Sequence, residues 1–285
     1  MNGSTLASDV LTALVPRVES LVERGLHPHL AVVIVGDDPS SHIYVRNKGR
    51  ACARVGIRSS IIHLPTNTTT GTLSQVIADL NEDPEIHGIL VQSPLPDGND
   101  EIGIVSEINP SKDVDGFHPI HLGRLVQGDA SGLLPCTPAG IMTMLDYYGV
   151  PIRGRRAVVI GRSRIVGMPL ALLLAQRGMD ATVTIAHSRT EDVEILCREA
   201  DLLCVAIGSP QFVQPDWVKE GVALIDVGIN RIEDPESGSG SRLVGDIDER
   251  AWPKSSYYTP VPGGIGPMTV AMLLDNTVSC SEASL

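Results

Sequence analysis

Residues 157–169 read AVVIGRSRIVGMP, and this stretch decides the fold. A short apolar run ends at Gly161, and Gly167 opens a segment with apolar residues at helical spacing. Strand, glycine turn and helix in that order predict a dinucleotide-binding βα unit, with free N–H groups at the helix start for a pyrophosphate. The spacing is G-x-x-x-x-x-G rather than G-x-G-x-x-G, so an ordinary βα turn without a ligand remains an alternative.

The strand expected at 182–186 leads into His187-Ser188-Arg189, with no carboxylate before Glu191. NAD enzymes usually place Asp or Glu there to bind the ribose hydroxyls. Arg162, with Ser188 or Arg189 beside it, would instead bind a 2′-phosphate. The pattern therefore predicts NADP rather than NAD, unless Arg162 is only an exposed charge on a turn.

Short β-branched runs alternate with helical segments along the whole chain, which predicts an α/β fold with mostly parallel sheets. We expect strands at 30–35, 59–64, 88–91, 157–160, 182–186, 202–207 and 223–227. We expect helices at 6–24, about 40–56, 72–83, 138–148, 166–177, 190–200 and from about 267. The polar stretch 127–132 and the glycine-rich stretch 260–266 predict two domains. Residues 1–132 form the first, with the helix 267–285 packing back on it, and 133–266 form a Rossmann-like second.

Composition narrows the function classes. The chain has 285 residues, 42% of them hydrophobic, and a net charge of −12 from 22 basic and 34 acidic residues. Scattered basic residues disfavour nucleic-acid binding, and no stretch has the length of a membrane span. Five cysteines without C-x-x-C spacing disfavour disulfides and zinc. We therefore expect a cytoplasmic enzyme.

A second group of residues suggests proton chemistry. Tyr44 and Lys48 are four apart on an expected helix, so they share one face. A partly buried lysine there is a candidate proton carrier, although a plain surface pair is the alternative. Gln92 follows the strand at 88–91, where a polar side chain can face a cleft.

Two loops have features of a ligand site. Asp115, in KDVDGFHPIH (112–121), is either a turn residue or a carboxylate that binds an N–H-rich ring. His118 and His121 beside it suggest a metal, but Pro119 disfavours the helical placement, so we expect none. The stretch TPVPGGIGP (259–267) allows close backbone approach to a ligand, or is only an interdomain linker. Ile229, in DVGIN (226–230), follows another strand end and would touch the nicotinamide half.

Seven segments in order resemble the bifunctional methylenetetrahydrofolate dehydrogenase/cyclohydrolase family. They are SHIYVRNK (41–48), VQSPLP (91–96), KDVDGFHPIHLGRL (112–125), PCTPAGIM (135–142), VVIGRSRIVGMP (158–169), DVGIN (226–230) and TPVPGGIGPMT (259–269). The resemblance implies an N-terminal folate domain, a Rossmann-like NADP domain, a folate site in the cleft between them and a homodimer. It implies oxidation of 5,10-methylenetetrahydrofolate with NADP, then hydrolysis to 10-formyltetrahydrofolate, within one-carbon metabolism and purine biosynthesis.

The resemblance also implies residue roles. Lys48 would be the catalytic lysine of hydration, Tyr44 would stack on the aminobenzoyl group, Gln92 would tune Lys48, and Asp115 would bind the pterin. The expected NADP contacts are Gly161, Arg162, Ser163, Ser188 and Ile229. The further expected substrate contacts are Val91, Ser93, Pro262, Gly263, Gly264, Ile265 and Gly266.

The chain departs from the family pattern at Ser93, where Leu is usual, at His121, where Asn is usual, and in lacking an N-terminal Gly-Lys. Two alternative functions remain. A monofunctional NADP dehydrogenase is disfavoured by the intact Tyr44, Lys48 and Gln92. A folate- or nucleotide-binding regulator without turnover is disfavoured by the presence of Lys48 and Arg162.

Overall fold

The computed structural model describes residues 1–235 and 240–285, except the side chains of residues 39 and 40. Its contacts divide the chain into two units. Unit 1 comprises Met1–Ala7, Leu125–Gly128 and Thr137–Thr269, and unit 2 comprises Ser8–Arg124, Asp129–Cys136 and Val270–Leu285. The first helix, α1 (Gly3–Glu23), and the last, α9 (Ile265–Ala283), each contribute residues to both units.

Unit 2 contains a parallel sheet in the order β2-β1-β3. Its strands are β1 (His29–Val35), β2 (Arg58–Leu64) and β3 (Gly88–Val91). Its other helical segments are α2 (Pro39–Val55), α3 (Thr70–Glu82), α4 (Glu101–Glu107), the 3-10 turn η1 (Pro110–Lys112) and most of α5 (Pro119–Gln127). The central strand β1 is almost entirely buried, so helices must cover both of its faces.

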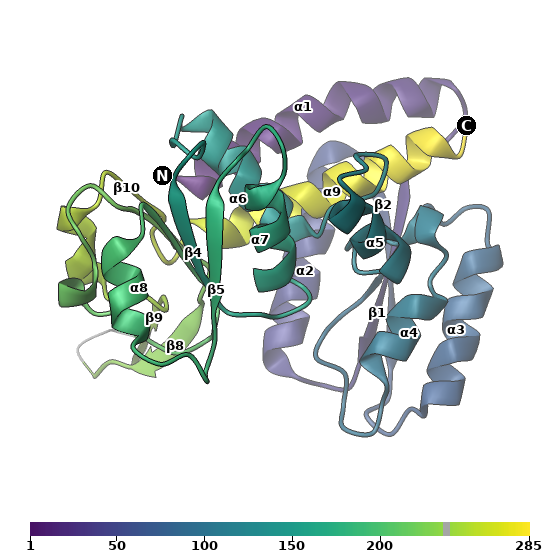
Figure 1. The fold of residues 1–285 in the computed structure, drawn as a ribbon. Helices are drawn as coiled ribbons and strands as arrows, with labels where there is room; N and C mark the ends of the chain where they lie inside the picture. Colours follow the sequence, from purple (N-terminus) through teal and green to yellow (C-terminus); the bar gives the residue numbers. More distant parts are fainter. Residues whose placement is uncertain (236–239) are drawn as a thin grey trace. The chain divides into compact units, whose positions relative to one another are not determined.

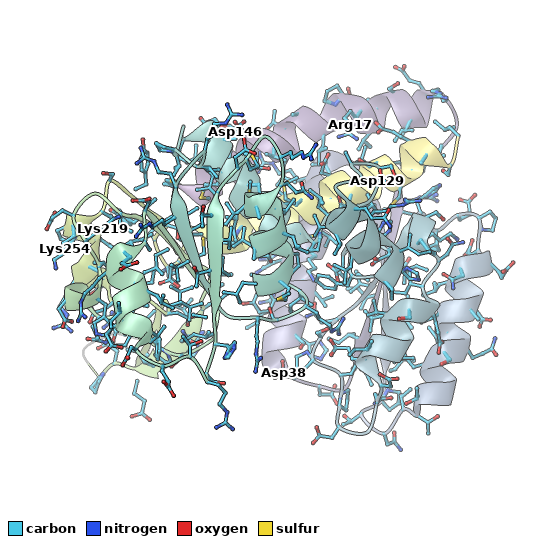
Figure 2. All side chains as sticks on the ribbon, in the orientation of Figure 1. Arg17, Asp38, Asp129, Asp146, Lys219 and Lys254 are labelled. Carbon is cyan, nitrogen blue, oxygen red and sulfur yellow. The ribbon has the colours of Figure 1, made fainter. Side chains whose placement is uncertain are left out.

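The core of unit 2 follows from the alternation of side chains along β1. Ala31, Val33 and Val35 face one way and pack with residues of α3 and α4. In Figure 1, α2 lies on the opposite side of β1 from those two helices. Helix α9 is tied to α1, because Arg17, labelled on α1 in Figure 2, pairs with Asp275 at 2.6 Å and with Glu282 at 2.7 Å.

Helix α2 carries the candidate lysine, and its ends follow from local chemistry. The side chain of Asp38 accepts a hydrogen bond from the Ser41 N–H at 2.7 Å and caps the helix. At the other end, Gly56 has a φ of 85°, which a residue with a side chain rarely adopts. These two residues set the limits of the helix.

Unit 1 contains a parallel sheet in the order β10-β7-β6-β4-β5. Its strands are β4 (Arg156–Ile160), β5 (Thr182–Ala186), β6 (Leu202–Val205), β7 (Ala223–Asp226) and β10 (Tyr257–Tyr258). Its helical segments are α6 (Cys136–Tyr147), α7 (Gly167–Ala175), α8 (Val193–Glu199), η2 (Pro215–Trp217) and η3 (Glu249–Lys254). A separate pair of antiparallel strands comprises β8 (Asn230–Glu233) and β9 (Ser241–Val244). Helices α7 and α8 cover opposite faces of the sheet (Figure 1).

The expected fold class, α/β with mostly parallel sheets, is confirmed, and every expected strand and helix is present. The strand expected at 202–207 ends at Val205, because the next residues form a loop. The strands β8, β9 and β10 and the helices α4 and α5 were not expected. Pro119 was expected to disfavour a helix, but it begins α5. Proline is tolerated at the first position of a helix, because an N–H there would have no partner within the helix. Within the described residues, no helix is long and apolar enough to cross a membrane.

Candidate active site

Lys48 is held at the carboxyl edge of the sheet of unit 2. Its Nζ donates to Gln92 Oε1 at 3.0 Å, and the Gln92 backbone N–H donates to Val33 O at 2.8 Å. The amide of Gln92 has a defined orientation, because its Nε2 donates to the carbonyl of Ser93 at 2.7 Å. The oxygen of that amide is therefore presented to the ammonium group. Tyr44 lies one turn earlier on α2 and is 43% exposed.

Asp115 lies within electrostatic range of Lys48. Burial raises the pKa of Asp115 to about 6, and the positive charge of Lys48 opposes part of that rise. The loop around Asp115 is fastened by α9, because Asn276 Nδ2 donates to Val114 O at 2.8 Å and to Leu134 O at 3.1 Å. Cys136 is buried beside the carboxylate, with Sγ 3.9 Å from Oδ1. Unit 2 thus brings together Tyr44, Lys48, Gln92 and Asp115.

Two expected substrate residues have little exposed side chain. Val91 is 5% exposed and Ile265 is 3% exposed, so both residues offer little surface to a ligand. Ser93 contributes its carbonyl to the orientation of Gln92, and that bond does not depend on the type of side chain at position 93. This explains why serine is compatible with the site at this position.

The two histidines of the 112–121 loop have backbone partners. His118 Nε2 lies 3.2 Å from Ser106 O, and its Nδ1 accepts from the Ile120 N–H. His121 Nε2 lies 2.8 Å from Pro110 O, and its Nδ1 accepts from the Leu133 N–H at 3.2 Å. These bonds occupy all four ring nitrogens and give both histidines a structural role.

The glycine turn after β4 admits no side chain at either end. Gly161 has a φ of +122°, and a Cβ built on it would lie 2.4 Å from Ala206 O. A Cβ on Gly167 would lie 2.1 Å from Gly161 O. The turn lies between β4 and β6, where the strand order of the sheet reverses. Ligands of open α/β sheets bind at that point, and the two glycines allow the backbone of the turn to pack closely against itself and against Ala206.

The N–H groups that begin α7 are occupied by Ser163. Its Oγ accepts from Val166 N at 3.1 Å and from Gly167 N at 3.3 Å, and its carbonyl accepts from Met168 N at 3.0 Å. The expectation that the N–H groups at this helix start are free for a pyrophosphate is therefore wrong. Serine hydroxyls accept hydrogen bonds from nearby backbone N–H groups, and the sequence contained that signal at position 163. An anion approaching the turn meets the exposed side chains of Arg162 and Ser163 instead.

Ser188 and Arg189 are exposed directly after β5. Because Ala186 at the end of β5 pairs with Ile160 at the end of β4, they leave the sheet at the same edge as Arg162. Ile229 follows β7 and is 44% exposed, and a Cβ on Gly266 would lie 3.3 Å from its Cδ1. Unit 1 therefore brings expected NADP residues to one sheet edge and places one expected substrate residue beside Ile229.

Two buried aspartates organise this edge and were not among the expected site residues. Asp246 is fully buried, and its Oδ2 accepts from the N–H groups of Ile207 at 2.8 Å and Gly208 at 3.0 Å. Its Oδ1 accepts from Asn230 Nδ2 at 2.8 Å. Asp246 thereby fixes the loop after β6 and the start of β8.

Asp226 complements this arrangement from the end of β7. Its carboxylate accepts the N–H groups of Gly228, Asp246 and Ile247 at 2.8–3.0 Å. Burial raises the pKa of Asp226 to about 7, and these N–H donors oppose that rise. The sequence signal for the pair is an Asp within two residues of a Gly at the end of an apolar run, in DVG (226–228) and in VGD (244–246).

The chain is similar to known proteins in sequence and in structure. Residues 1–115 match the catalytic-domain model of the tetrahydrofolate dehydrogenase/cyclohydrolase family, and residues 135–285 match its NAD(P)-binding-domain model. A bifunctional protein FolD from Chlorobium phaeovibrioides is 51% identical over 278 residues, which cover 96% of this chain and 94% of the relative.

Solved structures are similar over the whole chain. The bifunctional enzyme FolD, methylenetetrahydrofolate dehydrogenase/cyclohydrolase, from Campylobacter jejuni is 46% identical with a TM-score of 0.94, covering 100% of this chain and 98% of that one. The N5,N10-methylenetetrahydrofolate dehydrogenase-cyclohydrolase of Trypanosoma brucei, solved with NADP cofactor and inhibitor, is 40% identical with a TM-score of 0.94. It covers 100% of this chain and 97% of that one.

We predict that Asp246→Asn destabilises the protein by about 2–3 kcal/mol, because an amide NH₂ would face N–H donors and leave buried groups unpaired. Urea denaturation measures the change in the free energy of unfolding. The matched control is Asp216→Asn, an exposed position of the same unit, which should stay within about 0.5 kcal/mol of the wild type. Equal stability of the two variants would contradict the structural role of Asp246.

Proposed function

The chain belongs to the tetrahydrofolate dehydrogenase/cyclohydrolase family, and we propose how its residues divide the two reactions of that family. It oxidises 5,10-methylenetetrahydrofolate to the 5,10-methenyl cation with NADP, and it hydrolyses that cation to 10-formyltetrahydrofolate. The observation that carries the residue assignment is the hydrogen bond from Lys48 to Gln92.

We assign the hydration step to Lys48. Water adds to the methenyl carbon and loses one proton, the bond from that carbon to N5 breaks as N5 is protonated, and the hydroxyl proton passes to solvent to leave the formyl group on N10. An amine near the carbon takes up the proton from water and returns one to N5 as the bond breaks. Gln92 holds the amine through Oε1 and acts as a positioning residue.

The folate would be bound by groups of different chemistry. Tyr44 is exposed one helical turn from Lys48 and offers an aromatic face for the aminobenzoyl group. Asp115 accepts hydrogen bonds from the N–H groups of the pterin. The proposed border of the site comprises Val91, Ser93, Pro262, Gly263, Gly264, Ile265 and Gly266.

The oxidation step breaks a C–H bond of the methylene carbon, and the adjacent nitrogens stabilise the resulting cation. NADP, when bound, supplies the hydride acceptor. We propose that this chain holds it through the edge of unit 1, with Gly161 and Ser163 at the turn, Ile229 near the nicotinamide, and Arg162 with Ser188 at the 2′-phosphate. The absence of a carboxylate from 187 to 190 supports that phosphate assignment.

We further propose that residues 1–132 with 267–285 bind folate and that 133–266 bind NADP. In the same proposal the enzyme is a homodimer of the cytoplasm, and its 10-formyl product serves purine biosynthesis. The free thiols of all five cysteines, each of them buried, support a reducing compartment.

We predict that Lys48→Met abolishes hydration while substrate binding stays largely intact, because the thioether side chain fills similar space without a basic nitrogen. Loss of methenyl absorbance, corrected for the spontaneous reaction, measures the step. Arg46→Met, an exposed change on the same helix, is the control and should retain activity. Normal 10-formyltetrahydrofolate production by Lys48→Met would refute the assignment.

We predict that Arg162→Ala weakens NADP by at least about tenfold more than NAD, because only NADP carries the phosphate that the guanidinium would bind. Titration of each nucleotide by intrinsic fluorescence gives the two dissociation constants. Arg177→Ala, an exposed change in the same unit, should leave the ratio unchanged. Equal losses for both nucleotides would count against the 2′-phosphate assignment.

We predict that KM for methylenetetrahydrofolate rises as the pH falls from about 7 to about 5. The pKa of Asp115 is raised to about 6 by burial, so its carboxylate is lost over this range, and with it the acceptor for pterin N–H groups. In Asp115→Asn, KM should be high at every pH and this dependence should disappear. Asp9→Asn, at an exposed position, should keep the wild-type profile. An unchanged pH profile in Asp115→Asn would remove Asp115 from pterin binding.

A further inference from the structure

An exposed cluster of two imidazoles and one carboxylate lies at the start of α2. The ligand atoms of Asp37, His42 and His63 all lie within 4.8 Å of one another. Asp37 Oδ1 lies 3.2 Å from His63 Nε2 and 3.8 Å from His42 Nε2. The two imidazole rings meet edge to face, with centroids 5.2 Å apart. Both histidine side chains are about half exposed, so an ion can reach them from solvent.

The cluster is assembled by three different elements. Asp37 follows β1, His42 belongs to the first turn of α2, and His63 belongs to β2. The parallel pairing of β1 with β2 places His63 opposite Ile34, close to the end of β1. The first turn of α2 is set by the cap of Asp38, which Figure 2 labels at the start of that helix. The backbone therefore holds the three side chains together.

The chemistry of the donors selects a class of ion. Two imidazole nitrogens and a carboxylate oxygen suit Zn²⁺ and neighbouring transition metals, whereas Mg²⁺ and Ca²⁺ prefer oxygen ligands. Ligand atoms around a tetrahedral zinc lie about 3.3 Å apart, so small rotations of these side chains complete the geometry. The soft thiol ligands do not compete, because all five cysteines of the chain are buried.

We propose that Asp37, His42 and His63 bind one Zn²⁺-class ion, with water in the remaining coordination position. His63 Nε2, which lies 3.0 Å from Gly36 O, would exchange that contact for the metal and keep its proton on Nδ1. The ion then ties the first turn of α2 to β2. Because α2 also carries Tyr44 and Lys48, metal binding restrains the helix that bears them. Binding of the ion itself does not depend on the roles proposed for those two residues.

The experiment uses Zn²⁺ alone and the full chain after removal of metals with a chelator. Calorimetric titration should show one ion per wild-type chain, and no comparable binding of Mg²⁺. His63→Gln and Asp37→Asn should each weaken Zn²⁺ by at least about tenfold, because each removes a ligand. His27→Gln changes an exposed histidine of the same unit outside the cluster and should leave the affinity unchanged.

Hydrogen exchange provides the second measurement. Saturating Zn²⁺ should slow exchange of the amides in the first turn of α2 in the wild type and not in His63→Gln. Wild-type affinity in both His63→Gln and Asp37→Asn would overturn the site, and so would the absence of one-to-one binding in the wild type. Because the changed side chains are exposed, circular dichroism should show all variants folded, which keeps a loss of binding interpretable.

Discussion

The parallel pairing of β1 with β3 is the constraint on which the arrangement around Lys48 depends. Val33 of β1 lies opposite Val91 of β3, so the next residue, Gln92, leaves the sheet beside the end of β1. Helix α2 begins after that same end of β1 and returns Lys48 to it. The hydrogen bond between the two side chains follows from this register, and a slip of one residue would turn Gln92 to the other face.

In unit 1, parallel pairing likewise brings polar groups together at the edge where β4 and β6 end. Backbone atoms and two buried carboxylates form that edge. A buried carboxylate is costly unless it is hydrogen-bonded. Asp246 and Asp226 meet this requirement by accepting hydrogen bonds from N–H groups of nearby loops. The same hydrogen bonds offset the cost of burying the carboxylates and fix the conformation of those loops.

The sequence predicted the elements that have strong internal periodicity, together with the polar residues that follow them. The sheet at β1–β3 and the turn at Gly161 belong to this class. It did not predict β8 and β9, whose alternation is short and weak, or α5, whose first residue is a proline. The role of Asp246 depends on partners that only the folded chain brings together, so periodicity contains no signal for it.

His121 stands where the family pattern usually has asparagine, and its ring bonds to the backbone on both sides of the Asp115 loop. A side chain here must bridge Pro110 O and the N–H of Leu133, which requires one donor and one acceptor. Asparagine, which is usual at this position in the family pattern, has a donor and an acceptor on its amide. A neutral imidazole has a donor on one ring nitrogen and an acceptor on the other. His121 makes the pair of bonds that joins η1 to the segment before Cys136. The loop of Asp115 lies between those two segments, so these bonds anchor it.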